Sequence, residues 1–240
     1  MVYRIVIDTT QYHRGVIHLN PEQRHYLKNV LRLKDRNTFI AIDRTGNTYL
    51  AQLIGDNAQI IQSIKESTEL PIPVTLMVSL PKGNGFEDII RSCTELGVNT
   101  FIPVISERTL LKPSSHKLER WRKIATEATE QSERQIVPQI FDPASFSETL
   151  INVDKINSDC YICVTRRKAN HLLTYLSNSL TAPITIATGC EGGWTEQEVN
   201  EAIAAGFVPV SLGSRILRAV TAPIVSLSLI TSFVEKQSFP

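Results

Sequence analysis

The sequence GCEGGW at residues 189–194 directly follows a short apolar run, and so does the sequence LGSRILR at residues 212–218. The two runs, residues 184–188 and 207–212, have the apolar character of buried strands. Glycine stands in each stretch where the strand would end. In an α/β sheet, ligands bind beyond the carboxyl ends of the strands, where backbone groups converge on a crevice. The two stretches therefore predict one small-molecule pocket formed by two loops.

The glycine loop at residues 189–194 leads directly into the expected start of a helix. Glycine allows a ligand to approach main-chain N–H and C=O groups closely. Thr195 and Glu198 have the spacing of a capping box, which would fix the loop to the helix. Such helix starts often bind phosphate, but Glu191, Glu196 and Glu198 make this one acidic. The loop therefore favours a cationic or neutral polar ligand, although a turn that only needs glycine would have the same sequence.

The second loop, residues 213–220, is apolar and basic at once. It carries Arg215 and Arg218, and we expect Ile216 and Leu217 to be buried. A sequence this apolar does not suit a loop in solvent. We therefore expect a ligand, another part of the chain or a second subunit to cover it.

The rest of the chain divides at residues 69–73, where two prolines stiffen a connector that cannot extend a central strand. Residues 1–70 predict a small β-barrel with one helix, and residues 71–240 predict an α/β domain with a parallel sheet. The expected strands lie at 2–7, 38–42, 48–54, 59–64, 74–80, 100–105, 161–165 and 184–188. The expected helices lie at 21–31, 86–96, 115–135 and 170–180.

Composition argues against several classes of protein. The 240 residues carry a net charge of +1, so the overall charge does not indicate a polyanionic partner. No apolar run approaches the length of a membrane span, and the first residues alternate like a strand, so we expect a cytoplasmic protein. Cys160 and Cys163 lack a second Cys/His pair, which favours small buried side chains over a metal site. Neither G-x-G-x-x-G nor G-x-x-x-x-G-K-[ST] occurs, which argues against a nucleotide di- or triphosphate.

Basic side chains gather locally although the whole chain is nearly neutral. Residues 24–44 contain only two acidic side chains against six basic ones: Arg24, Lys28, Arg32, Lys34, Arg36 and Arg44. This excess could bind phosphates or form an ordinary solvated surface. Helical spacing also places Glu127, Gln131 and Arg134 on one face, and that pattern suits a binding site and a solvated face equally.

Several motifs in order resemble the SPOUT class of RNA methyltransferases, and most closely its bacterial family that methylates N3 of a uridine in small-subunit ribosomal RNA. The two loops carry the resemblance, in GCEGGWT at 189–195 and SLGSRILRAVTA at 211–222. Further matches are Lys82-Gly83, Glu87, TELGV at 94–98, Glu107-Arg108, Arg120-Trp121, and EQS at 130–132 with Arg134. The resemblance covers nearly the whole chain. It implies a trefoil-knotted α/β domain after a PUA-like barrel, a homodimer formed through the knot, and S-adenosylmethionine bound in the knot.

The resemblance also implies roles for particular residues. A sulfonium cofactor without phosphate suits the acidic glycine loop, and its expected contacts, mainly through backbone, are Gly189, Gly193, Leu212, Gly213, Ile216 and Leu217. Because N3 must lose its proton, Arg218 is expected to stabilise the anionic base, and Glu191 to accept the proton or bind the cofactor ammonium. Ion pairs that brace the knot are the alternative role for both. The expected contacts with small-subunit ribosomal RNA, free or in the assembled 30S subunit, are Arg24, Arg32, Lys34, Lys82, Arg108 and Arg134.

Three positions depart from the family pattern. Cys190 replaces a proline of the glycine loop, Ser92-Cys93 stands where a lysine is expected, and Val220 replaces a glutamate. The missing carboxylate at Val220 leaves the identity of the general base open. Two alternatives therefore remain: a methyltransferase of the same fold that acts on another RNA position, and a non-catalytic RNA-binding or assembly factor.

Overall fold

The structure of the chain is a computed structural model that describes residues 3–65, 67–153, 158–176 and 182–238. The chain forms two compact units. Met1–Glu69 and Thr129–Val137 belong to the first unit, and Leu70–Ala128 and Pro138–Pro240 belong to the second. The polypeptide therefore passes between the units at three points along its length.

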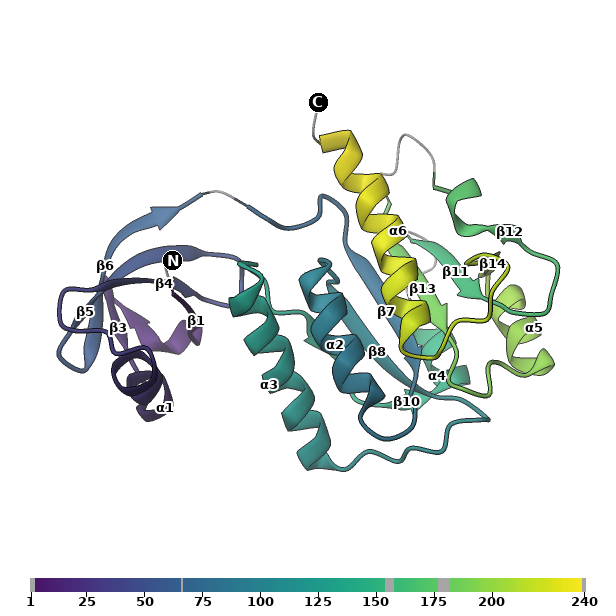
Figure 1. Ribbon diagram of the computed structural model, residues 1–240, viewed down its shortest axis with the longest axis horizontal. Helices are drawn as coiled ribbons and strands as arrows, with labels where there is room; N and C mark the ends of the chain where they lie inside the picture. Colours follow the sequence, from purple (N-terminus) through teal and green to yellow (C-terminus); the bar gives the residue numbers. More distant parts are fainter. Residues whose placement is uncertain (1–2, 66, 154–157, 177–181, 239–240) are drawn as a thin grey trace. The chain divides into compact units, whose positions relative to one another are not determined.

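The first unit is built on a six-stranded sheet in the order β1-β4-β5-β6-β3-β2 (Figure 1). β1 and β4 are parallel, and the other neighbouring strands are antiparallel. The strands are β1 (Arg4–Val6), β2 (Tyr12–His13), β3 (Val16–His18), β4 (Thr38–Ile42), β5 (Thr48–Ile54) and β6 (Asn57–Ile64). Side chains alternate between the two faces of each strand, and the inward ones form a core around Ile17, Phe39 and Leu53. The small β domain that the sequence predicts is confirmed.

The helix α1 (Pro21–His25) begins where the sequence predicts. The Asn20 side chain accepts the Gln23 N–H at 2.8 Å, and the Gln23 side chain accepts the Asn20 N–H at 2.9 Å. This capping box satisfies backbone donors that the first turn of a helix leaves free. A π-helical turn at Tyr26–Val30 continues the helix and buries Leu27 in the core.

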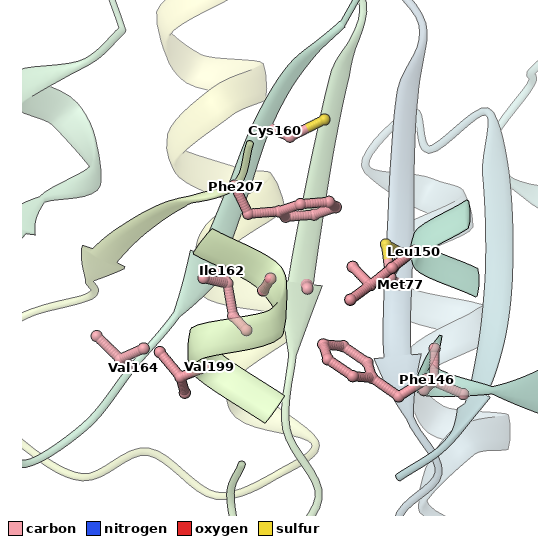
Figure 2. Close-up of a cluster of buried hydrophobic side chains, with 11 residues drawn as sticks. Met77, Phe146, Leu150, Cys160, Ile162, Val164, Val199 and Phe207 are labelled. Carbon is pink, nitrogen blue, oxygen red and sulfur yellow. The ribbon is translucent and has the colours of Figure 1, made fainter. Parts of the chain in front are cut away.

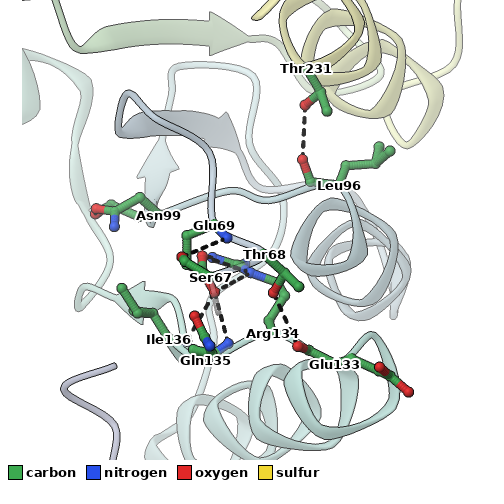
Figure 3. A network of polar contacts seen from close by, with 11 residues as sticks. Ser67, Thr68, Glu69, Leu96, Asn99, Glu133, Arg134, Gln135, Ile136 and Thr231 are labelled. Atoms are coloured by element: carbon green, nitrogen blue, oxygen red, sulfur yellow. Dashed lines mark hydrogen bonds and ion pairs between the residues drawn. The ribbon is translucent and has the colours of Figure 1, made fainter. Parts of the chain in front are cut away.

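The segment Thr129–Val137 is attached to the first unit by the carboxylate of Glu69 (Figure 3). Glu69 Oε2 accepts the Arg134 Nε–H at 3.1 Å. Glu69 Oε1 accepts the backbone N–H groups of Gln135 at 2.8 Å and Ile136 at 3.0 Å. The Arg134 side chain is only 3% exposed and that of Glu69 15%, so this is a buried, extensively hydrogen-bonded ion pair. We call these contacts the Glu69 clasp.

Two more acidic side chains join the same segment to β1. Arg4 lies 2.7 Å from the Glu133 carboxylate, and the Val6 N–H donates to Glu130 Oε1 at 2.6 Å. Both contacts span more than 120 residues of sequence. Local sequence patterns therefore do not predict them.

The second unit contains a parallel sheet in the order β10-β8-β7-β13-β11-β14-β12, with β9 paired to β8. The strands are β7 (Val74–Ser79), β8 (Thr100–Ile105), β9 (Gln139–Ile140), β10 (Ala144–Ser145), β11 (Asp159–Cys163), β12 (Asn170–His171), β13 (Ile184–Thr188) and β14 (Val208–Ser211). The helices are α2 (Gly85–Glu95), α3 (Ser115–Gln131), α4 (Phe146–Asn152), α5 (Glu196–Ala204) and α6 (Thr221–Ser238). The parallel α/β architecture that the sequence predicts is confirmed.

Helices cover both faces of this sheet. On one face, α2 and α6 pack side by side, and the Thr231 hydroxyl donates to the Leu96 carbonyl at 2.8 Å (Figures 1 and 3). On the other, Phe146 of α4 and Val199 of α5 pack against Met77 and Ile162 of the sheet (Figure 2). Removal of each such large side chain from water contributes about 2 kcal/mol to folding. Packing on two faces explains why these strands are mostly apolar.

Two expectations in this unit were wrong. Residues 170–176 do not form the expected helix but contain β12 and a short 3₁₀ turn at Leu172–Thr174, while residues 177–181 of the expected helix lie outside the described part of the chain. Ile216, expected to be buried, is 62% exposed, because no described part of the chain covers it.

None of the described helices has the length and apolar character required to span a membrane.

Candidate functional site

A cavity of about 980 Å³ in the second unit is lined mainly by three loops, with Arg108 of the loop after β8 also on its wall. The three loops follow β11, β13 and β14, at residues 163–167, 189–196 and 211–222. β11 lies between β13 and β14, and all three strands are parallel, so their carboxyl ends meet at the same edge of the sheet. The glycine loop and the apolar, basic loop after β14 therefore lie on one cavity, as expected.

Two glycines, Gly189 and Gly193, shape the glycine loop. Gly193 has φ +67°, and a Cβ added there would meet nothing within 4 Å. A Cβ on Gly189 would lie 3.1 Å from Gly193 Cα, so the loop folds back on itself too closely for a side chain. The Gly193 N–H donates to the Cys190 carbonyl at 2.9 Å and closes the turn. The loop therefore presents its backbone to the cavity.

The start of α5 is fixed as the sequence predicts. The Thr195 hydroxyl accepts the Glu198 N–H at 3.2 Å, and Glu198 Oε2 accepts the Thr195 N–H at 2.8 Å. Glu198 Oε1 also accepts the Glu107 N–H at 2.8 Å, and the side chain is buried. Both carboxylate oxygens of Glu198 therefore accept backbone N–H groups within the fold. The acidic side chains that line the cavity are Glu191 and Glu196.

Arg108, which is expected to contact RNA, donates hydrogen bonds to the glycine loop. Its Nη1–H donates to the Gly192 carbonyl at 2.6 Å and to the Trp194 carbonyl at 3.4 Å. A Cβ on Gly192 would lie 3.0 Å from Arg108 Cβ and Cδ, so the two chain segments are in close contact. The Cys190 thiol donates to the Arg108 carbonyl at 3.4 Å and strengthens the same connection. Cys190 thereby fixes this turn at the position where the resemblance leads one to expect proline.

Glu191 forms a second connection across the cavity edge. Its carboxylate accepts the backbone N–H of Lys82 at 3.1 Å and 3.4 Å, while the Lys82 side chain stays exposed. The contact joins the glycine loop to the loop after β7. Both of these predicted site residues therefore lie at one edge of the sheet.

The loop after β14, which we call the arginine loop (residues 213–220), forms the remaining wall. The carbonyl of Arg218 accepts the N–H groups of Thr221 at 2.9 Å and Ala222 at 3.0 Å, so its backbone fixes the start of α6. The Arg218 side chain is exposed and lines the cavity together with Leu212 and Leu217. Within the described residues, the Arg218 guanidinium has no carboxylate partner. An ion pair that braces the loop is therefore absent from this part of the chain.

The loop after β11 supplies cavity residues that were not predicted from the sequence. Arg166 and Arg167 both line the cavity, and Arg167 Nη2 lies 3.0 Å from Glu196 Oε1. The signal was present, since three consecutive basic residues closely follow a buried strand. Cys163, at the end of that strand, has a thiol whose pKa burial raises to about 12, so it stays protonated at neutral pH.

The other residues expected to contact RNA differ in how exposed their side chains are. Arg32 and Lys34 are both partly or fully accessible to solvent, and Arg24 pairs with Asp56 at 3.1 Å. Arg134 is buried in the Glu69 clasp, so its guanidinium is not on the surface. A buried guanidinium does not suit the expected contact of Arg134 with RNA.

Comparison with known proteins agrees with this site. Residues 68–231 match a family model described as an RNA methyltransferase domain, and residues 19–65 match one described as an RNA methyltransferase PUA domain. The chain is 49% identical, over 98% of its length, to the ribosomal RNA small subunit methyltransferase E of Synechocystis sp., of which it covers 79%. It is 34% identical to the protein of that name from Bacillus subtilis, with 88% of this chain and 87% of that one covered.

Solved structures give the same result. The crystal structure of a ribosomal RNA small subunit methyltransferase E from Neisseria gonorrhoeae, bound to S-adenosyl methionine, matches with a TM-score of 0.88 and 29% identity. The match covers 97% of this chain and 98% of that one. The chain therefore belongs to the SPOUT-class RNA methyltransferase family, as its sequence predicts.

Proposed function

We propose that the protein transfers a methyl group from S-adenosylmethionine to N3 of a uridine in small-subunit ribosomal RNA. The observation that carries the proposal is the cavity formed by three loops beyond β11, β13 and β14. It is lined by glycines, by apolar side chains, and by the side chains of two glutamates and five arginines. The names of the relatives at 49% and 34% identity support ribosomal RNA as the substrate.

The residues present suit this cofactor. The open space beside Gly193, where a Cβ would meet nothing within 4 Å, leaves room against the loop backbone. We propose Gly189, Gly193 and Gly213 as backbone contacts and Leu212, Ile216 and Leu217 as apolar ones. The bound cofactor supplies an electrophilic methyl group on a sulfonium centre.

Arg218 is our candidate for the residue that stabilises the uridine anion. The N3 nitrogen reacts only after its proton has left, and the negative charge then resides largely on O2 and O4. A guanidinium at either oxygen stabilises that charge through charge-assisted N–H donors. The exposed Arg218 side chain, with its backbone fixed at the start of α6, supports this role. Glu191, at the same cavity, is our candidate proton acceptor or partner of the cofactor ammonium.

We also propose that the protein is a homodimer formed through this unit. Ile216 is 62% exposed in the single chain although it lies in an apolar loop. The helix α6 carries apolar side chains that are only partly buried: Ile224, Val225, Leu229 and Phe233. A second subunit would cover both surfaces. Sedimentation equilibrium should give twice the chain mass of 26.9 kDa.

Two measurements test the proposed function. Isothermal titration with S-adenosylmethionine should show heat of binding, and a protein that only binds RNA should show none. Incubation with ribosomal RNA from cells that lack the gene should add one methyl group, which mass spectrometry of nuclease fragments should locate on a uridine base. A methyl group on a ribose or another base would refute N3 specificity and favour the other RNA-modifying alternative.

Replacement of Arg108 by alanine should lower the affinity for S-adenosylmethionine about tenfold. The variant loses the charged hydrogen bonds that hold the Gly192 and Trp194 carbonyls, and each such bond contributes about 1.5–3 kcal/mol. Calorimetry measures the cofactor affinity, and filter binding measures the RNA affinity of the same variant. Arg108→Lys is the matched control: it retains the charge, so retained RNA binding with weak cofactor binding indicates the loop-holding role. Loss of RNA affinity alone in Arg108→Ala would refute it.

A further inference from the structure

The loop after β11 concentrates positive charge beside the cavity. Residues 165–168 read Thr-Arg-Arg-Lys, and Arg166 and Arg167 are cavity residues. Five arginines line the cavity, from the loops after β8, β11 and β14, against two glutamates. A concave surface with this charge attracts polyanions, because its walls focus the field.

The partners of these cations separate them into two kinds. Arg167 is neutralised by Glu196 at 3.0 Å, and Arg108 is committed to carbonyls of the glycine loop. Arg166 and Lys168 are exposed, and within the described part of the chain neither has an ion-pair partner. These two side chains are therefore the ones in this loop available to an external anion.

The backbone holds Arg166 in an unusual conformation. Its φ is +55°, in the left-handed region, which costs a residue with a Cβ about 1 kcal/mol. The chain is fixed on both sides of this bend: the Val164 N–H donates to the Val210 carbonyl at 2.9 Å, and Asn170 pairs with Val210 in the sheet. The same left-handed conformation occurs at Arg14, Arg32, Arg36 and Arg44, so it does not by itself mark a ligand site. What it contributes here is a bend that is fixed on both sides and places Arg166 on the cavity.

We propose that Arg166 and Lys168 form a clamp for the RNA backbone, binding phosphates of the single strand that flanks the target nucleotide. The inference rests on the proposed function, since it requires an RNA at this cavity. A base that enters a deep pocket is first displaced from its stack, and its neighbouring phosphates then lie at the pocket mouth. Arginine suits this position because its planar fork binds two phosphate oxygens at once, while lysine adds a mobile point charge.

The test uses a double variant that carries both Arg166→Gln and Lys168→Gln. The control is Arg91→Gln, which removes an exposed charge from α2. Binding of the ribosomal RNA that the wild type methylates is measured from about 50 to 200 mM salt, with S-adenosylmethionine affinity measured in parallel. The slope of log K against log salt should become shallower by about 0.7 for each phosphate that is no longer neutralised, or about 1.4 for both. RNA affinity at about 100 mM salt should fall about tenfold or more. Arg91→Gln should leave the slope and the cofactor affinity unchanged.

The outcomes separate the clamp from its alternatives. An unchanged slope and RNA affinity in the double variant would overturn the proposal. So would lost cofactor affinity with intact RNA binding, because the loop would then bind the carboxylate of the cofactor. If the wild type neither binds S-adenosylmethionine nor methylates RNA, the proposed function fails on its own measurements, whereas salt-dependent binding that responds to Arg166 would still establish an RNA-backbone site. Circular dichroism and thermal unfolding check that these exposed substitutions leave the fold intact.

Discussion

Replacement of Arg218 by alanine should lower the rate of methyl transfer to RNA by at least about 10²-fold, because removal of one donor to a developing oxyanion has effects of about 10²–10³-fold. The expected loss is in the chemical step. The backbone carbonyl that fixes the start of α6 remains in the variant, so the loop should keep its shape. Single-turnover transfer from labelled S-adenosylmethionine measures the rate. Calorimetry and sedimentation of the variant should show the same cofactor affinity and the same oligomeric state as the wild type.

The matched control for this variant is Arg215→Ala, on the same loop and also exposed. A general loss of positive charge at the cavity would slow both variants to the same extent and weaken RNA binding in both. A specific role in stabilising the uridine anion should affect Arg218→Ala far more, with RNA affinity nearly unchanged. Turnover at the wild-type rate in Arg218→Ala would refute the assignment.

Replacement of Glu69 by alanine should lower the free energy of unfolding by about 3–5 kcal/mol, the usual effect of removing one partner from a buried ion pair. The variant leaves the Arg134 guanidinium buried without this carboxylate, and the N–H groups of Gln135 and Ile136 without this acceptor. Urea denaturation followed by circular dichroism measures the change.

Glu133→Ala provides the comparison for the clasp. Its carboxylate pairs with Arg4 at 2.7 Å, but the Glu133 side chain is 58% exposed. Exposed pairs contribute about 0–1 kcal/mol, so this variant should unfold close to the wild type. Equal destabilisation by both substitutions would show that burial of the Glu69 clasp has no special effect.

Much of the second unit could be predicted from the sequence, because its determinants are local. A parallel sheet covered on both faces requires continuous apolar strands, and the capping box at Thr195 and Glu198 is a short-range pattern. The close approach of Gly189 to Gly193 is likewise visible in the sequence, because it requires glycine within residues 189–194. For the same reason, the loops after β13 and β14 could be located before the structure was known.

The features that could not be predicted depend on distant partners. The sequence predicts Arg134 on a helical face, but α3 ends at Gln131 and Arg134 lies in the segment that follows. Its buried guanidinium pairs with Glu69, which lies 65 residues earlier in the chain. The exposure of Ile216 depends on what lies outside the chain. Arg166 and Arg167 differ from these residues, because the sequence does show a run of basic residues after a strand. Only the structure shows that this run lies at the cavity.

The division of α3 between the units has a consequence for biosynthesis. Thr129–Val137 completes the first unit, but it is translated after β7, α2 and β8 of the second unit. Until Val137 has left the ribosome, the β domain lacks the segment that covers Val6, Ile40 and Ile42. The amino-terminal unit therefore cannot finish folding before more than half of the polypeptide has been made. A fragment that ends at Glu69 would carry the same exposed apolar surface.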